Sequence, residues 1–500
     1  MTQNAYILAI DQGTSSSRAF VFDSDMNAVA TAQQEFEQLY PQPGWVEHDP
    51  EAIWASVSAV VGRAMDKAAI PVGALASIGI TNQRETTVVW DRKTGKALMN
   101  AIVWQDRRTA ADCQALRSAG HEAMVTARTG LKLDPYFSAT KLRWILDNVD
   151  GVRRRAEAGE LAFGTVDTFL VWRLTGGRAH VTDATNASRT LLFNIHTQTW
   201  DDELLELFDI PRALLPEVLD CTADFGASRV DLLPDGVPVT GVAGDQQAAL
   251  IGQAGFDPGM TKSTYGTGCF VIANTGEEAL ESGNQLLTTV AYRLGGKVTY
   301  GLEGSVFVAG SAIQWLRDEL RLIDAAPETG AIAAKTGVVS DLVVVPAFAG
   351  LGAPYWDQYA RGAIVGLTRG ANRDHIVRAT LESIAYQTRD VIECQEQDSG
   401  IETKELKVDG GASMNDFLMQ FQSDILGVPV LRPRIVETTA RGSGFLAGLA
   451  VGFWRDQKEL ENAFELDTRF EPSLGKEQRD KLYAGWQKAV EKAKDWEEKE

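Results

Sequence analysis

The segment AIDQGTSSSRAFVFD, residues 9 to 23, places a carboxylate, a glycine and several hydroxyls in one turn between two apolar runs. Asp11 at the end of the first run could reach Mg²⁺, directly or through water. Gly13 would let the backbone approach a phosphate, and Arg18 could take residual phosphate charge. Further donors come from the hydroxyl side chains of Thr14, Ser15 and Ser16. The alternative is a polar hairpin with Arg18 in a surface ion pair, and this stretch alone leaves both interpretations open.

A second carboxylate follows a predicted strand end in GVAGDQQAAL, where Asp245 precedes a helical pattern. An aspartate in this position is often only a helix N-cap. Phosphoryl transfer to a hydroxyl, however, needs one carboxylate near the metal and another that accepts the hydroxyl proton. Asp245 is therefore a candidate for the proton acceptor.

Arg84 and Glu85 come directly after a predicted strand at residues 76–81. An adjacent Arg–Glu pair is usually a solvated surface pair of little energetic consequence. In a cleft, the same pair could bind neighbouring hydroxyls, because arginine donates hydrogen bonds and glutamate accepts them.

Two glycines, Gly410 and Gly411, precede a predicted helix N-terminus in VDGGASMNDF, Val408 to Phe417. Close packing could explain them. A flat nucleoside lying against bare backbone at the start of a helix would explain them equally well.

The chain that must position these residues is 500 residues long and has a net charge of −20, with 44% hydrophobic and 23% charged residues. This length predicts two or more domains. The acidic balance disfavours nucleic acid and anionic membranes as partners. The four cysteines form no C-x-x-C pair, and no secretory leader or long apolar run is present, so we expect a cytoplasmic protein with reduced thiols.

Two Gly-rich hairpins lie about half a chain apart, in AYILAIDQGTSSSRAFVFD and in TKSTYGTGCFVIANTG. Turns of this kind converge backbone N–H groups on an anion, and two of them suggest two related domains facing each other across a cleft. Between them, strands alternate with helical patterns, which predicts an α/β fold with mixed sheets and helices outside. The pattern at residues 374–395 predicts a long amphipathic helix, and the charged tail after Lys476 predicts a solvated surface helix.

Several other catalytic motifs are missing. No G-x-x-x-x-G-K-[ST] loop, H-E-x-x-H or G-x-S-x-G occurs, and the five histidines are not clustered. The triplet Asp224–Gly226 reads DFG, but no H-R-D element accompanies it. Metal-hydrolase, catalytic-triad and protein-kinase chemistry are therefore disfavoured.

Two long segments, YFSATKLRWILDN at 136–148 and GAIVGLTRGANRDHIVRATLE at 362–382, resemble the two signatures of the FGGY family of carbohydrate kinases. Shorter matches are TNQRETTVVWD, IVWQDRR, GDQQAAL, YGTGCF and DGGASMND, so the resemblance covers essentially the whole chain. It implies two actin-like, ribonuclease-H-type domains with ATP in the cleft between them. The first, 1–251, would carry polyol, phosphates and catalytic base, and the second, 252–500, would carry the nucleotide.

The resemblance also implies a role for each candidate residue. Asp245 would be the general base, and Asp11 and Asp245 would bind Mg²⁺. Glycerol would be contacted by Arg84, Glu85, Trp104, Tyr136, Asp245, Gln246 and Phe270. ATP would be held by Thr14, Ser15, Ser16, Arg18, Thr267, Gly310, Gln314, Gly411 and Asn415.

The implied activity is direct, Mg²⁺-assisted transfer of a phosphoryl group from ATP to glycerol, giving sn-glycerol 3-phosphate, the first step of glycerol catabolism. The implied assembly is a homo-oligomer, a dimer or a tetramer. Two alternatives remain open. A kinase for another small polyol or a ketose would need a wider pocket. An actin-like ATPase acting as a chaperone or filament subunit would need neither the Arg84–Glu85 pair nor the segment around Tyr136.

Overall fold

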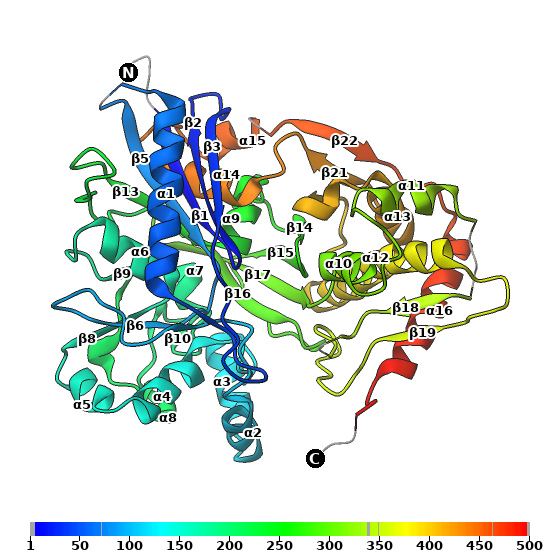
Figure 1. Cartoon of the computed structure of the whole chain (residues 1–500), viewed down its shortest axis with the longest axis horizontal. Helices are drawn as coiled ribbons and strands as arrows, with labels where there is room; N and C mark the ends of the chain where they lie inside the picture. Colours follow the sequence, from blue (N-terminus) through cyan, green and yellow to red (C-terminus); the bar gives the residue numbers. More distant parts are fainter. Residues whose placement is uncertain (1–5, 72, 338–340, 349, 463, 498–500) are drawn as a thin grey trace.

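The computed structural model describes residues 6–71, 73–337, 341–348, 350–462 and 464–497, and Figure 1 shows two lobes built on two β-sheets. The first sheet has the order β13-β5-β1-β2-β3. Strands β1, β2 and β3 are antiparallel neighbours, whereas β5 and β13 run parallel to β1. The strands are β1 (Tyr6–Gln12), β2 (Ser16–Phe22), β3 (Ala28–Glu35), β5 (Leu75–Asn82) and β13 (Val239–Gly244).

The second sheet has the order β16-β17-β15-β14-β20-β21-β22. Its five central strands repeat the pairing of the first sheet, with two antiparallel strand pairs followed by two parallel pairs. The expectation of two related halves is therefore met at the level of topology. The strands are β14 (Thr261–Tyr265), β15 (Cys269–Gly276), β16 (Leu287–Leu294), β17 (Lys297–Val306), β20 (Leu406–Asp409), β21 (Val430–Pro433) and β22 (Leu466–Phe470).

The first sheet is covered on both faces, which explains why β1 is apolar almost throughout. One face packs against α1 (Pro50–Ala68) and α6 (Val166–Leu174). The other face packs against α14 (Thr438–Ala450), which belongs to the second half of the chain. The approach is close, because a Cβ on Gly79 of β5 would lie 2.1 Å from the carbonyl oxygen of Ser443.

Helix α9 (Asp245–Gly252) crosses α14 between the two sheets, as Figure 1 shows. Glycines form this crossing. A Cβ on Gly442 would lie 1.8 Å from the carbonyl oxygen of Ala248, and one on Gly252 would lie 2.0 Å from that of Thr438. The helices therefore touch backbone to backbone, and neither glycine has room for a side chain.

The β16–β17 hairpin crosses from the second sheet into the core of the first half. Leu287 packs in a cluster with Phe137 and Leu192, and the Tyr300 hydroxyl donates to the carbonyl of Ile195 at 2.7 Å. The second half of the chain thus contributes two elements to the core of the first, α14 and this hairpin.

The segment between β5 and β13 forms the lower part of the first lobe, and it carries four of the predicted site residues, Arg84, Glu85, Trp104 and Tyr136. Its larger elements are β6 (Val88–Asp91), α2 (Ala110–Ser118), α3 (Glu122–Thr129), α4 (Ser138–Asn148), α5 (Val152–Glu157), β8 (Leu161–Gly164), α7 (Ala184–Ala187) and α8 (Asp202–Phe208). The second lobe adds α10 (Gly310–Asp318), α11 (Glu328–Lys335), α12 (Arg373–Ser399), α13 (Asp416–Leu426) and α16 (Lys476–Ala493).

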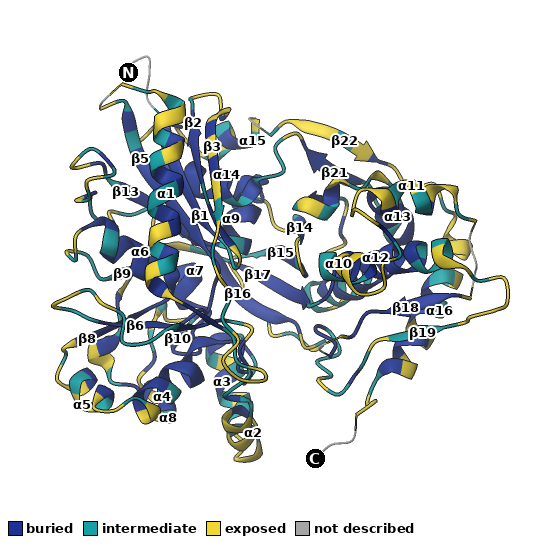
Figure 2. Cartoon of the chain, in the orientation of Figure 1, coloured by how far each residue is buried: buried dark blue, intermediate teal, exposed yellow. Residues whose placement is uncertain are grey.

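Two helix predictions have different outcomes. The long helix is confirmed as α12. The tail is helical, as α16, but the prediction that it is merely a solvated surface helix is wrong: one face is buried and the other is exposed (Figure 2). Tyr483 and Trp486 on the buried face donate hydrogen bonds of 2.6 and 2.8 Å to the two carboxylate oxygens of Asp390 on α12.

Other sequence expectations concern cysteines, membranes and domain limits. All four cysteines are free thiols. Among the described residues, no helix has the length and apolar character needed to cross a membrane. The division of the chain into 1–251 and 252–500 stays a prediction.

Candidate active site

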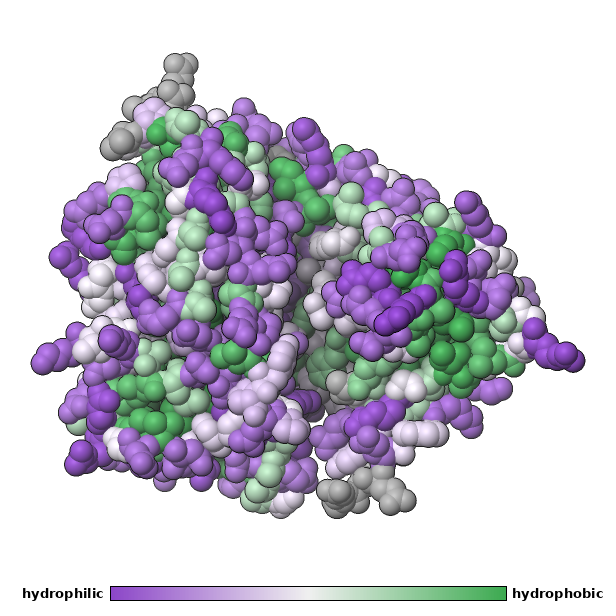
Figure 3. Space-filling model, viewed as in Figure 1, coloured by the Kyte–Doolittle hydropathy of each residue, from purple (hydrophilic) through white to green (hydrophobic). Residues whose placement is uncertain are grey.

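Two adjoining cavities open at the groove between the lobes that Figure 3 shows: residues of both halves line the smaller one, and residues of the second half line the larger one. One has a volume of about 330 Å³ and the other about 770 Å³, and Gly266, Thr267 and Gly411 line both. Every site residue predicted from the sequence lines one of them. The smaller cavity is lined by Asp11, Thr14, Ser15, Ser16, Arg18, Arg84, Glu85, Trp104, Tyr136, Asp245, Gln246, Thr267, Phe270 and Gly411. The larger one is lined by Thr267, Gly310, Gln314, Gly411 and Asn415.

The two Gly-rich turns face this shared space. In the β1–β2 turn, the Gly13 amide donates to the carbonyl of Ser16 at 2.9 Å. In the β14–β15 turn, the Gly266 amide donates to the carbonyl of Gly268 at 2.9 Å. The second turn also receives the start of α10, because the Gly310 amide donates to the carbonyl of Gly266 at 3.0 Å. Backbone and hydroxyl donors from both halves therefore surround one cavity, which suits a polyphosphate.

Gly410 allows the segment after β20 to pass close to β14. Its φ is +83°, and a Cβ there would lie 2.6 Å from the carbonyl oxygen of Tyr265. Asn415, a little further along, accepts from the Leu418 amide at 3.1 Å and donates to Thr329 Oγ1 at 3.1 Å. Its side chain is thus the N-cap of α13 and holds the cavity wall against α11.

Asp11 is buried, and its carboxylate makes no hydrogen bond or ion pair with any other residue that the structure describes. Burial raises its pKa to about 7, even though Arg18 lowers it, and Glu437 and Asp245 raise it further. A buried carboxylate in no direct ion pair fits a divalent metal ion, which would offset that cost. The residues present are therefore compatible with Mg²⁺.

Arg18 pairs with Glu437 from the second half of the chain, and their side chains are 35% and 43% exposed. The sequence left open whether Arg18 binds phosphate or forms a surface pair. It forms an ion pair, yet that pair lines the cavity beside the β1–β2 turn.

The Arg84 guanidinium is buried, and each of its three nitrogens has a protein partner. Nε lies 3.1 Å from Asp245 Oδ1. Nη1 donates to Gln247 Oε1 at 3.2 Å and to Glu303 Oε2 at 2.5 Å. Nη2 donates to Glu303 Oε1 at 3.1 Å and to the Tyr136 hydroxyl at 3.4 Å. Arg84 is therefore not a surface residue, and its orientation is fixed on every side.

Glu85 adopts a left-handed backbone conformation, with φ of +59°, which costs about 1–2 kcal/mol for a residue with a side chain. The Ser138 hydroxyl at the start of α4 donates to its carbonyl at 3.0 Å and helps to hold it. Its Oε1 accepts from Arg189 Nε at 2.6 Å. Burial raises the pKa of Glu85, although Arg189 and Arg84 counteract that effect.

An aromatic wall stands beside this pair. The Trp104 ring centroid lies 5.6 Å from that of Tyr136 and 6.2 Å from that of Phe270. The Trp104 indole N–H donates to Thr14 Oγ1 at 3.0 Å. The apolar wall predicted for a short carbon chain is thus present, and it is hydrogen-bonded to the β1–β2 turn.

Asp245 begins α9 and has one oxygen committed. Oδ1 accepts from the Gln246 amide at 2.7 Å and pairs with Arg84, whereas Oδ2 has no hydrogen bond to another described residue. Burial raises the pKa of Asp245, while Arg84 and Lys262 lower it. Because the side chain is 27% exposed toward the cavity, Oδ2 can accept a proton from a bound hydroxyl.

Sequence reasoning missed the side chains behind the site, which are Arg189, Gln247, Lys262 and Glu303. Lys262 donates to Gln246 Oε1 at 2.5 Å and so sets the orientation of that amide. The readable signal for Glu303 was an acidic residue that follows Leu302 inside a strand pattern, KVTYGLEGSV, because buried acids are rare unless paired. The sequence offered no comparable signal for Arg189.

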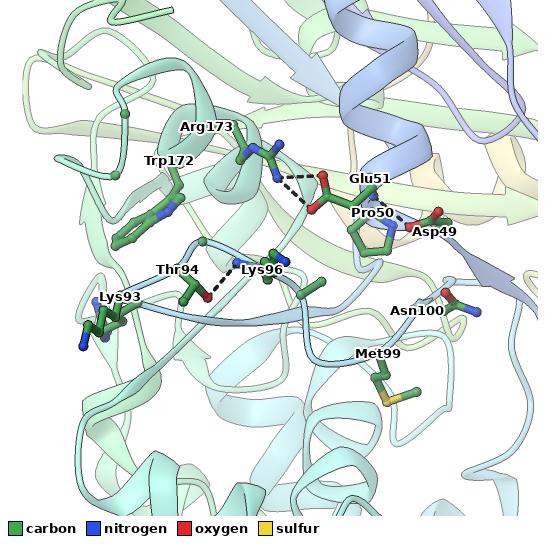
Figure 4. Close-up of a pocket in the computed structure, with 15 residues that line it drawn as sticks. Asp49, Pro50, Glu51, Lys93, Thr94, Lys96, Met99, Asn100, Trp172 and Arg173 are labelled. Carbon is green, nitrogen blue, oxygen red and sulfur yellow. Dashed lines mark hydrogen bonds and ion pairs between the residues drawn. The ribbon is translucent and has the colours of Figure 1, made fainter.

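A further cavity of about 850 Å³ lies apart from these residues, at the N-terminus of α1 (Figure 4). Arg173 and Glu51 form a two-contact ion pair beside it, at 2.8 and 3.0 Å. None of the residues predicted to act in catalysis lines it.

Comparison with known proteins shows which proteins the chain resembles. The model for the N-terminal domain of the FGGY family of carbohydrate kinases matches residues 6–252, and that for the C-terminal domain matches residues 261–451. Glycerol kinase 2 of Thermotoga maritima is 58% identical over 494 residues, covering 99% of this chain and all of that protein. Glycerol kinase 1 of Pseudomonas aeruginosa is 60% identical, covering 98% and 99%. The crystal structure of Plasmodium falciparum glycerol kinase with ADP has a TM-score of 0.91 at 38% identity, covering 98% of each chain.

Proposed function

The chain belongs to the FGGY family of carbohydrate kinases, and on that premise we propose that its smaller cavity binds glycerol and the γ-phosphoryl end of ATP, with the nucleoside in the larger one. The chain phosphorylates glycerol with ATP, giving sn-glycerol 3-phosphate, the first step of glycerol catabolism. Its two-domain, actin-like fold is the one inferred from the sequence.

The observation that carries the site assignment is the position of Asp245 beside Arg84, with Oδ2 free of hydrogen bonds to the other residues that the structure describes. Asp245 accepts the proton of the hydroxyl that attacks ATP. Glu85 accepts from a neighbouring hydroxyl, and Arg84 and Tyr136 orient it. The carbon chain lies against Trp104 and Phe270.

The donors around the phosphates stabilise the charge that spreads over the γ-phosphoryl oxygens in a loose transition state. From the first half these are the turn residues Thr14, Ser15 and Ser16 with Arg18, and from the second half Thr267. Asp11 and Asp245 would hold Mg²⁺, which when bound neutralises phosphate charge. Gly310, Gln314, Gly411 and Asn415 form the wall against which the nucleoside lies.

Neither alternative has an observation in its favour. A volume of about 330 Å³ shared by polyol and phosphates suits a three-carbon substrate. A burial of Arg84 and Glu85 this complete is not required for ATP hydrolysis alone.

The test is ATP-dependent phosphorylation of a panel of glycerol, dihydroxyacetone, erythritol and xylulose, with ADP release and product mass measured together. We expect the highest kcat/KM for glycerol and little ADP release without a polyol. A higher value for xylulose, or rapid ADP release without any acceptor, would overturn the proposal.

Three further points belong to the same proposal and rest on the family resemblance. The activity requires Mg²⁺ and is lost on chelation, the enzyme is cytoplasmic, and it assembles as a homo-oligomer, a dimer or a tetramer. Light scattering coupled to size-exclusion chromatography measures the assembly directly.

A further inference from the structure

Four buried charges of alternating sign form a closed ring beneath the polyol cavity. Glu303 contacts Arg84 at 2.5 and 3.1 Å and Arg189 at 2.9 Å. Arg189 contacts Glu85 at 2.6 Å, and Glu85 lies 3.9 Å from Arg84, which closes the ring. The side chains of all four are at most 2% exposed. The ring has no net charge, so each member is compensated by two neighbours of opposite sign.

The members come from three distant parts of the chain. Arg84 and Glu85 follow β5, Arg189 follows α7, and Glu303 lies on β17 in the second half. Burial alone would raise the pKa of Glu303, but Arg189 and Arg84 hold it at about 2, so the carboxylate is ionised at neutral pH. The β16–β17 hairpin thus brings a permanent negative charge into the core of the first half.

Only two of the four face the cavity. Arg84 and Glu85 line it, whereas Arg189 and Glu303 are fully buried behind them. Glu303 accepts from both Nη1 and Nη2 of Arg84, a two-point contact that fixes the plane of the guanidinium. Arg189 engages only Oε1 of Glu85 and leaves Oε2 for a substrate hydroxyl.

Arg189 also reaches the aromatic wall. Its guanidinium carbon lies 5.5 Å from the ring centroid of Tyr136 and 5.3 Å from that of Phe137. Both distances are within the range of cation–π attraction. Arg189 therefore contacts both Glu85 and Tyr136, two residues that the proposed function places against the polyol.

We propose that Arg189 and Glu303 are positioning residues for polyol recognition: they fix the donor face of Arg84 and the acceptor oxygen of Glu85 at the spacing of two neighbouring hydroxyls. The inference rests on the proposed function, because it names what orients the polyol in that same site. The inference gives Glu303, from the second half of the chain, a part in polyol recognition. Apart from Phe270, and Lys262 behind Gln246, the other members of this subsite belong to the first half.

The physical reason is the cost of an unpaired charge in a dry site. Removing the charge of Glu303 leaves two buried arginines that share only the carboxylate of Glu85 within the ring, and Arg84 then turns toward other acceptors. Removing Arg189 frees Glu85 to pair with Arg84 directly, which would occupy the atoms that the substrate needs. Either change misplaces hydrogen-bonding groups, and a site built around hydroxyls is sensitive to that.

The experiment compares Glu303→Gln, Arg189→Gln and the double variant with the unmodified enzyme, using KM for glycerol, KM for ATP, and the increase in Tm caused by added glycerol. We expect each single variant to raise KM for glycerol by ~10-fold or more, with little change in KM for ATP, and to lose most of the glycerol-induced Tm increase. The double variant, which restores charge balance, should be less impaired than the product of the two single effects.

The matched control is Asp220→Asn, which removes the 2.5 Å ion-pair partner of Arg293 outside both cavities. It should leave KM for glycerol unchanged. Should Glu303→Gln fail to fold, Glu303→Asp keeps the charge but shortens the side chain, and the same rise in KM is expected. Folded single variants with lowered Tm but normal KM for glycerol would overturn the inference. Failure of the unmodified enzyme to use glycerol would instead overturn the proposed function.

Discussion

The pair formed by Arg18 and Glu437 predicts that one acidic residue weakens nucleotide binding. Arg18 is proposed to contact the phosphates of ATP, yet it is engaged by Glu437 from the other half of the chain. Glu437 precedes α14 but makes no capping hydrogen bond there, so replacing it should not unsettle the helix. Glu437→Gln should therefore lower KM for ATP, because the phosphates no longer compete with a carboxylate for Arg18.

The size of the effect follows from exposure. The two side chains are 35% and 43% exposed, so solvent screens their attraction. Pairs of this kind contribute ~0.2–1 kcal/mol, which corresponds to a change of about 1.4- to 5-fold in affinity. The gain should shrink as ionic strength rises, since salt screens exposed charges.

The assay is KM for ATP at saturating glycerol, at low and at high ionic strength. Arg18→Gln should raise KM for ATP, and Glu465→Gln, which removes the partner of the exposed Arg434, should have no effect. If Glu437→Gln leaves KM for ATP unchanged at low ionic strength, the competition does not exist. If it raises KM, Glu437 instead holds Arg18 in its working position.

Three further predictions concern the base, the helix crossing and pH. Asp245→Asn should lower kcat by ~10²–10⁴-fold with ATP binding retained, and near-normal turnover would refute its role as base. Gly442→Ala forces a Cβ to within 1.8 Å of a carbonyl oxygen and should destabilise the fold by ~1–3 kcal/mol or more, measured by thermal unfolding. The control, Gly485→Ala on α16, has nothing within 4 Å of its new Cβ and should not lower stability. Equal Tm values for the two variants would contradict the close crossing. Burial raises the pKa of Asp390 to about 7 in the folded protein, so folding favours its protonated form. The resulting contribution to the free energy of unfolding is complete below the ordinary pKa of 3.8 and is lost as pH rises through 7. The loss amounts to up to about 4 kcal/mol. Tm should fall over that interval, and Asp390→Asn should flatten the fall; an unchanged slope would refute the assignment.

Sequence reasoning located what is local in the chain. The turn from Asp11 to Arg18 and its counterpart around Thr267 are short sequence motifs. Gly13 and Gly410 mark places where the backbone passes close to another backbone segment. From these and the alternation of strands and helices, the duplicated topology could be predicted. Trp104, Phe270, Gly310, Gln314 and Asn415 were instead assigned to the site by the resemblance to the FGGY family.

Contacts between distant segments could not be predicted. Glu303 is 219 positions from Arg84, and Arg189 is 104 positions from Glu85, so no spacing rule connects them. The error on α16 was avoidable: Tyr483, Trp486 and Val490 recur at helical spacing within a run dominated by charge, and that stripe is the buried face.

The packing of α14 from the second half against the first sheet has a consequence for biosynthesis. The face of the first sheet that α14 covers cannot be closed until that helix has been synthesised, and about 200 residues separate the end of β13 from the end of α14. At ~5–20 residues per second, the emerging chain carries this open apolar surface for about 10–40 s. During that interval the ribosome-bound chain is a natural client for a chaperone, and a message truncated before residue 438 would release a product whose first sheet stays open to proteases.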